Sequence, residues 1–491
     1  MFRIKYGPTA VLTSSLLLGA CPSSGAKPHA SDAPASPPPA AGAQAAPVAG
    51  MADAPKPAGS PAADGGKGGS TPSPAPAGTG GSTPGTTAPT QIQRSSVGPN
   101  TAPSVPDADY KTFIANINKF GLELGQKLAS DDKIKKENLI YSPLSVTIAL
   151  GMTYAGAKGS TATELKTALG DSFASGVFHT ATNRLSRELA SRRTSRSDAD
   201  GNAHKVELNI VDAIFVDQST TLQMPFLDLM SREYDSGVRR LDFVHAFEPA
   251  RMTINGWVEE QTKNKIEDLL QPGTISDMTR VVLVNAIYFY ATWQAPFSPD
   301  FTKDKPFKTL GGQSAQVPTM GGQLNLAYRA ADKFEVAELP YEGNQLRMTI
   351  VLPAEGQFEA VRSQISAAWL DQAVAGLQPA LLQVSLPKFK LTGGPFKLIE
   401  SLKALGIQKL FADADLSGIA TIPLTVSEVV QKAFIAVDEN GAEAGAATAV
   451  VTGPPSAPAT IPFVVDRPFL FFIRDSNGAV LFSGHVVSPA Q

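Results

Sequence analysis

Residue types that perform enzyme chemistry are present in this chain, but not at the spacing that a catalytic or metal site requires. The sequence contains no Gly-x-Ser-x-Gly turn, no His-Glu-x-x-His motif and no glycine-rich phosphate loop that ends in Lys-Ser or Lys-Thr. With one cysteine there is no cysteine pair for zinc, and the histidines after residue 107 lack ligand spacing: His179, His204, His245 and His485. We therefore expect no catalytic residue, no metal and no cofactor, and a hydrolase is disfavoured.

The remaining chemical capacity is backbone hydrogen bonding, which a run of residues with small side chains after Asp438 could provide. In the strand period of two, one face of this run is small and almost wholly apolar: Ala442, Ala444, Ala446, Thr448, Val450 and Thr452. The only charge, Glu443, lies on the opposite face, and no proline interrupts residues 442–452. This segment could therefore enter an existing sheet as a new strand without overpacking it.

The run from Glu439 to Thr448 resembles the hinge of inhibitory serpins, and residues 426–434 and 466–473 resemble the strands that lead into and out of their reactive-centre loop. The resemblance covers most of the chain after about residue 107. It implies an α+β fold of three β-sheets with about eight or nine helices and an exposed loop at about 439–466. It also implies that a serine protease cleaves this loop and is held in a covalent complex while the loop inserts into the main sheet.

The residues on the small apolar face, which would insert, distinguish between two functions. One is an inhibitor, and the alternative is a non-inhibitory binding or structural protein with the serpin fold. A bulky or charged residue on that face would favour the alternative, and none is present between Ala442 and Thr452. We therefore expect an irreversible suicide-substrate inhibitor that acts as a monomer. The resemblance assigns its hinge to Glu439, Gly441, Ala442, Glu443, Ala444, Gly445, Ala446, Ala447 and Thr448.

The cleaved bond lies, by family spacing, near residues 455–457. Bonds before proline resist most proteases, which removes Ala457–Pro458 and favours Ser456–Ala457. Other bonds remain open: Pro455–Ser456, Thr452–Gly453 and Ala459–Thr460. Since no Lys or Arg occurs from Ala442 to Asp466, small residues point to elastase-like or subtilisin-like serine proteases.

Helices and strands, predicted from the spacing of apolar residues, must hold this loop above a sheet that can open. We expect helices at 110–128 and 252–270, strands at 206–216 and 281–290, and an apolar helix after Ser142-Pro143. The resemblance places five residues where the sheet opens: Ser142, Ser145, Asn285, Trp293 and Gln431. Each serine could instead bond its own helix backbone. Gln431 stands where the family usually has histidine, so it retains a donor and an acceptor but no charge.

An arginine-rich stretch runs from Arg184 to Arg196. Some serpins bind sulfated polysaccharide near the equivalent helix, which is one interpretation of this stretch. A solvated face is the interpretation that we favour, because Asp198 and Asp200 follow directly.

Residues 1–21 have the layout of a signal peptide, and Leu18-Gly19-Ala20-Cys21 resembles a bacterial lipobox. We expect lipidation at Cys21 and a secreted lipoprotein; Pro22 after it favours the outer membrane or cell surface, with a periplasmic face still open. Residues 22–106 are rich in Pro, Ala, Gly and Ser without aromatics, so we expect a disordered tether before one domain at 107–491. A net charge of −3 gives no reason to expect nucleic acid, and the membrane is contacted only through the anchor.

Overall fold

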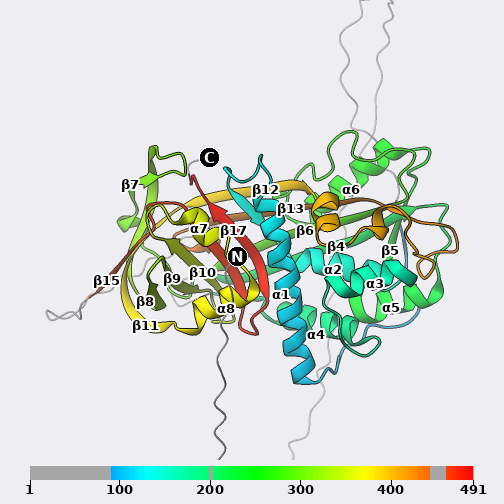
Figure 1. Cartoon of the computed structure of the whole chain (residues 1–491), viewed down its shortest axis with the longest axis horizontal. Helices are drawn as coiled ribbons and strands as arrows, with labels where there is room; N and C mark the ends of the chain where they lie inside the picture. Colours follow the sequence, from blue (N-terminus) through cyan, green and yellow to red (C-terminus); the bar gives the residue numbers. More distant parts are fainter. Residues whose placement is uncertain (1–89, 198–202, 443–459, 490–491) are drawn as a thin grey trace, which may run out of the picture. The chain divides into compact units, whose positions relative to one another are not determined.

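The computed structural model describes residues 90–197, 203–442 and 460–489, all within one compact unit (Figure 1). The sites predicted at Cys21, at 443–448 and at 452–459 lie outside these residues. Within them the chain forms nine α-helices and two hydrogen-bonded sheet networks, which confirms the α+β class.

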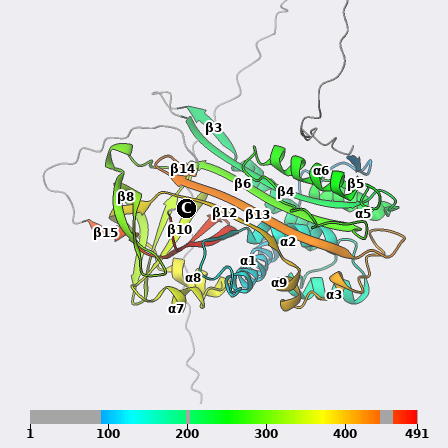
Figure 2. The same ribbon diagram turned by 90° about the horizontal axis from the view of Figure 1, so that it is seen from above.

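The main sheet has a mixed parallel and antiparallel topology (Figure 2). Its order is β1 (Gln91–Gln93), β5 (Val238–Leu241), β4 (Ala203–Asp217), β6 (Val281–Thr292), β14 (Gly441–Ala442), β13 (Val426–Asp438) and β12 (Phe389–Lys397), with β3 (Thr194–Ser197) paired to β4. β6 is buried at all but one of its positions. The near-continuous apolar sequence predicted this two-sided burial.

The second network turns at one long strand, β8 (Ser314–Ala331). The first part of β8 pairs with β7 (Lys303–Lys308), its middle with β11 (Gln378–Pro387) and its last residues with β9 (Phe334–Pro340). The network continues through β10 (Leu346–Pro353), β16 (Phe469–Asp475), β17 (Val480–Val486) and β2 (Leu139–Tyr141), and it ends on the other side at β15 (Ile461–Val464). The described residues therefore form two hydrogen-bonded networks where the resemblance implies three sheets, because β8 pairs with different strands along its length.

The helices enclose the main sheet on both faces. They are α1 (Asp107–Ala129), α2 (Pro143–Tyr154), α3 (Gly159–Ala168), α4 (Val177–Ser191), α5 (Met224–Tyr234), α6 (Phe247–Gln261), α7 (Phe358–Arg362), α8 (Ala367–Ala375) and α9 (Ile399–Ala404). Figure 2 shows α6 on one face of the main sheet and α1 and α2 on the other. Three apolar clusters result: one on each face of the main sheet, and a third in which α7 and α8 pack against β9, β10, β16 and β17. Helix α2 is buried at every position except its last residue, which fits its mostly apolar sequence.

Two predicted boundaries differ from the structure. The helix expected at 252–270 begins at Phe247 and ends at Gln261, because Lys263 and Asn264 adopt left-handed backbone angles of 54° and 58° that a helix cannot continue. The residues that the structure describes also include secondary structure before the predicted start of the domain at Asp107. β1 pairs with β5 through Gln91–Gln93, so the last residues of the predicted tether form an edge strand of the main sheet.

Candidate functional site

The start of the predicted hinge already lies inside the main sheet. Gly441 and Ala442 form the short strand β14, which pairs with β13 on one side and with β6 on the other. Below this point β6 and β13 pair directly and in parallel, from Val281 to Tyr288 on β6. The sheet is thus closed along most of its length and opened at one end by two residues of the loop (Figure 2).

Backbone contact explains why these two residues must be small. Gly441 has a φ of 149°, and a Cβ added there would lie 1.9 Å from the carbonyl oxygen of Ala291. Ala442 has no exposed surface and belongs to the apolar cluster on the α1–α2 side of the sheet. Since Ala442 is the first residue of the predicted inserting face, that face points into the core at the one position the structure describes.

Glu439 fixes the hinge to residues that flank the neighbouring strands. Its carboxylate accepts from Lys388 Nζ at 2.7 Å and from Thr302 Oγ1 at 2.7 Å, and its carbonyl accepts from the backbone N–H of Phe297 at 2.8 Å. Burial raises the pKa of Glu439, but the Lys388 ammonium and the Thr302 hydroxyl outweigh burial and hold the pKa below its usual value. Glu439 is therefore ionised and anchored at neutral pH.

Trp293 covers the opened end of the sheet, as the resemblance implies. Its indole Nε1 donates to the carbonyl of Asp438 at 2.9 Å, and its backbone N–H donates to the carbonyl of Asn440 at 2.6 Å. The ring stacks on Tyr341, with 4.5 Å between centroids and 9° between planes. Trp293 thus touches the hinge residues directly and can monitor their insertion.

The other four predicted sheet-opening residues meet, fully buried, beneath the junction of β6 and β13. Gln431 Nε2 donates to Asn285 Oδ1 at 2.5 Å and to the carbonyl of Ser142 at 2.9 Å, and Gln431 Oε1 accepts from the Ser142 N–H at 3.2 Å. Glutamine therefore makes the bonds that join the two strands to α2. Because its amide does not titrate, we expect these bonds to persist across the physiological pH range.

The two serine hydroxyls do not span the sheet opening. Ser142 caps α2 by accepting from the backbone N–H of Ser145 at 3.2 Å, and its hydroxyl donates to the carbonyl of Leu481 at 2.7 Å. The Ser145 hydroxyl donates to the Ser142 hydroxyl at 3.0 Å. In this state of the sheet both hydroxyls bond at the N-terminus of α2 and Ser142 also bonds to Leu481, while the backbone of Ser142 contacts Gln431.

Asp212 is the residue of this cluster that the sequence reasoning missed. It lies on β4 opposite Asn285, whose Nδ2 donates to it, so the polar chain runs from α2 through β13 and β6 to β4. The signal was available: Asp212 interrupts the apolar face of Leu208, Ile210 and Ile214 at the strand period of two.

Every guanidinium group of the arginine-rich stretch has a hydrogen-bond acceptor, and three of the five face a carboxylate. Each guanidinium group contacts a carboxylate, an amide oxygen or a backbone carbonyl: Arg184 with Asp107 and Glu188, Arg187 with Asn183 and the carbonyl of Asn100, Arg192 with Asp475, Arg193 with the carbonyl of Leu208, and Arg196 with Glu342. These contacts favour a surface face over a polyanion site.

Two further classes of site were sought in the described residues. No group of three or more His, Cys, Asp or Glu side chains among them is placed to hold a metal ion. None of the described helices combines the length and apolar character needed to cross a membrane.

Comparison with known proteins agrees with the geometry. The family model for serpins (serine protease inhibitors) matches residues 115–489. A serpin-like protein of Thermococcus kodakarensis is 34% identical over 77% of this chain and 86% of its own length. Serpin-ZXA of Oryza sativa subsp. japonica is 35% identical over 78% of this chain and 98% of its own length. Serpin B4 of Homo sapiens is 34% identical over 76% of this chain and 98% of its own length.

Solved structures give the same result. Native tengpin, a thermophilic serpin, superposes with a TM-score of 0.71 at 26% identity and covers 82% of this chain and 100% of its own. Native protease nexin-1 with heparin superposes with a TM-score of 0.68 at 29% identity and covers 77% of this chain and 100% of its own. Sequence, fold and the loop residues seated between β6 and β13 together show that the chain belongs to the serpin family.

Proposed function

We propose that this serpin is an irreversible suicide-substrate inhibitor of serine proteases that prefer small residues, of the elastase or subtilisin type. The observation that carries the proposal is the seat of Gly441 and Ala442 between β6 and β13. The strand pair that must separate is already parted at the end where the loop enters. Insertion after cleavage would extend β14 downwards between the same two strands.

The energy available from insertion is sufficient for the mechanism. About 12 residues added as a central strand form roughly that many hydrogen bonds on each edge, at about 0.5–1.5 kcal/mol apiece. Insertion also breaks the direct pairing of β6 with β13, so the net gain is on the order of 10 kcal/mol, which is comparable to the roughly 5–15 kcal/mol stability of a trapped protease. Insertion would therefore supply enough free energy to distort an acylated enzyme.

Protease preference rests on the loop sequence. The absence of Lys and Arg from Ala442 to Asp466 leaves trypsin-like enzymes no side chain to bind. Ser456–Ala457 is the proposed reactive bond, with Pro455, Thr452 and Ala459 as alternative positions before the cut. The competing function, a non-inhibitory binding or structural protein, predicts cleavage without capture.

The proposed location follows from the N-terminal sequence. Lipidation of Cys21 would anchor the protein to the outer membrane or cell surface, with residues 22 onwards as the tether. Labelling with a radioactive fatty acid tests this: the wild type should take up label and Cys21→Ser should not. Label on neither protein would refute the anchor and leave the inhibitory proposal intact.

The decisive experiment for inhibition uses residues 90–491 and a panel of elastase-like and subtilisin-like proteases. We expect a complex that survives boiling in detergent, together with release of a C-terminal peptide. The N-terminal sequence of that peptide identifies the cleaved bond. Cleavage of the loop by every protease without any such complex would establish the non-inhibitory alternative.

A further inference from the structure

The polar cluster beneath the junction of β6 and β13 must change when a strand enters between them. In this state Asn285 and Gln431 are direct partners in the ladder, and Gln431 Nε2 donates to Asn285 Oδ1 at 2.5 Å. Neighbouring strands lie about 4.8 Å apart, so a strand inserted between β6 and β13 moves these two residues to about 10 Å apart. Insertion therefore breaks this bond and leaves one buried donor and one buried acceptor without each other.

The register of β14 identifies the residue that would arrive between them. The second residue of β14 pairs with Ala291 of β6 and with Val437 of β13, and both pairings are antiparallel. Each further residue of the loop therefore lies opposite the preceding residue of both strands. Thr448 lies six residues further along the loop, and six residues back along the two strands lie Asn285 and Gln431. Continuing this register places Thr448 directly between them.

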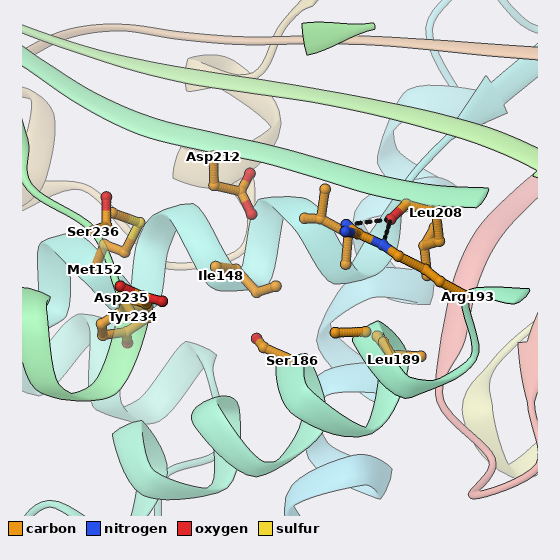
Figure 3. Close-up of a pocket in the computed structure, with 12 residues that line it drawn as sticks. Ile148, Met152, Ser186, Leu189, Arg193, Leu208, Asp212, Tyr234, Asp235 and Ser236 are labelled. Atoms are coloured by element: carbon orange, nitrogen blue, oxygen red, sulfur yellow. Dashed lines mark hydrogen bonds between the residues drawn. The ribbon is translucent and has the colours of Figure 1, made fainter. Parts of the chain in front are cut away.

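The side chains at these positions share one face of the sheet. Ala442 belongs to the apolar cluster on the α1–α2 side, and a step of six residues keeps the same face in the strand period of two. Asn285 and Gln431 lie on this side too, because residues two positions away on their strands belong to the same cluster: Leu283, Ile287, Val429 and Ala433. Figure 3 shows Asp212, the next residue of the polar chain, pointing from β4 toward α2 on that side. A side chain at position 448 would therefore enter the polar cluster itself.

Polar residues meet at this position and at no other position from 444 to 450 on the inserting face. In the same register Ala444, Ala446 and Val450 would each meet two apolar residues of the cluster, namely Phe289 with Ile435, Ile287 with Ala433, and Leu283 with Val429. Thr448 alone would meet two amides. A threonine hydroxyl offers one donor and two acceptor lone pairs, and the broken bond leaves one acceptor on Asn285 and one donor on Gln431.

We propose that Asn285 and Gln431 form a receptor for one residue of the cleaved loop, and that the hydroxyl of Thr448 occupies it. The hydroxyl accepts from Gln431 Nε2 and donates to Asn285 Oδ1, so it replaces both partners of the broken bond. Gln431 keeps its bonds to the backbone of Ser142, and Asn285 keeps its bond to Asp212. The polar chain from α2 to β4 thus stays continuous through the inserted strand.

The receptor also determines the register of insertion. A shift of the inserted strand by two residues would place an apolar side chain against both amides and leave them unpaired, which costs free energy in a buried site. This inference rests on the proposed function, because it requires that the cleaved loop inserts.

Thermal unfolding of protein 90–491, before and after complete cleavage of the loop, tests the receptor. A cysteine protease such as papain is used for cleavage, and mass measurement confirms that the cut lies after residue 453. Thr448→Val keeps the shape of the side chain and removes the hydroxyl, so its cleaved form should melt roughly 2–6 °C below cleaved wild type. Thr448→Ser restores the hydroxyl and should melt like wild type. Before cleavage both variants should melt like wild type, because β6 and β13 pair directly there.

Moving the hydroxyl by one pair tests the register. Thr448→Val combined with Val450→Thr keeps the composition and the face, but it places the hydroxyl between Leu283 and Val429, where neither side chain can bond it. The cleaved double variant should melt below cleaved Thr448→Val.

The outcomes separate this inference from the proposed function. If cleavage raises the melting temperatures of wild type and Thr448→Val to the same value, the receptor is overturned and the inhibitory proposal stands. If the double variant melts like wild type after cleavage, the register is wrong and the receptor is overturned. If cleavage does not raise the melting temperature of wild type, insertion and the receptor are overturned together.

Discussion

Ala442→Arg places a charge at the first position of the inserting face, where the native side chain is fully buried beneath the sheet. If the hinge stayed in place, the guanidinium would be buried without a partner. That penalty is several kcal/mol for an unpaired ion, with roughly 1–3 kcal/mol more for overpacking.

The alternative for this variant is to expel the hinge from the sheet. Expulsion gives up the pairing of Gly441 and Ala442 with Val437, Asp438, Ala291 and Thr292. Four backbone pairs at about 0.5–1.5 kcal/mol each amount to roughly 2–6 kcal/mol. Expulsion is thus no more costly than burial, and both raise the barrier to insertion.

A barrier increase of about 3 kcal/mol slows insertion roughly 100-fold, since each 1.36 kcal/mol is tenfold in rate. The protease would then hydrolyse the acyl bond before the loop inserts, and the inhibitor would become a substrate. Electrophoresis in detergent at increasing inhibitor-to-protease ratio measures both outcomes. We expect cleaved Ala442→Arg protein and almost no covalent complex.

Two controls separate insertion from a general effect of the charge. Ala442→Ser keeps the side chain small and should inhibit like the wild type. Ile461→Arg adds the same charge at an exposed position on β15, beyond the predicted cleavage site, and should also keep inhibition. Stoichiometric covalent complex with Ala442→Arg would refute the reasoning, because insertion would then tolerate a buried charge at its first step.

Three further predictions concern the hinge and the core. Gly441→Ala should destabilise the inserted hinge, because its Cβ would meet the Ala291 carbonyl, and Trp293 fluorescence should report the displacement; an unchanged spectrum would contradict this. Lys388→Met removes the ion pair of Glu439 and should lower the free energy of unfolding by about 1–3 kcal/mol at pH 7. Since the pKa of Glu439 is depressed in the folded protein, this loss should shrink as the pH falls below about 4.5. A loss that does not change with pH would exclude the ion pair as its cause. Burial lowers the pKa of His485 to about 3, so the unfolded state binds a proton at a higher pH than the folded state, and the free energy of unfolding should fall as the pH decreases from about 6.5. His485→Gln removes this effect, so the variant should lose roughly 3 kcal/mol less than the wild type between pH 6.5 and pH 4. Equal losses for both proteins in urea titrations would contradict this prediction.

The sequence predicted the strands that frame the site because their patterns are strong and local. β6 reads as an apolar run buried on both faces, and β4 alternates, so their existence and their side-chain faces could be deduced from period two alone. The small-residue period after Asp438 likewise identified the inserting face. At Ala442, the position that the structure describes, this face is directed into the core.

Other features depended on contacts between distant segments. The end of α6 at Gln261 follows from left-handed residues whose side chains give no strong breaker signal, and the pairing of β1 with β5 joins residues almost 150 positions apart. The hydroxyls of Ser142 and Ser145 could be placed near the opening, but their partners depend on where Leu481 and Gln431 lie. The period of β4 marks Asp212 as a polar residue on an apolar face, but its partner Asn285 lies on the neighbouring strand and could not be read from that period.

Thermal unfolding of the domain before and after cleavage of the loop tests the central claim most directly. If the loop inserts between β6 and β13, the cleaved form gains on the order of 10 kcal/mol. At about 2 °C per kcal/mol for a large domain, its melting temperature should rise by roughly 20 °C. An unchanged or lower melting temperature after complete cleavage would show that the severed loop stays outside the sheet, and would contradict the proposed inhibition.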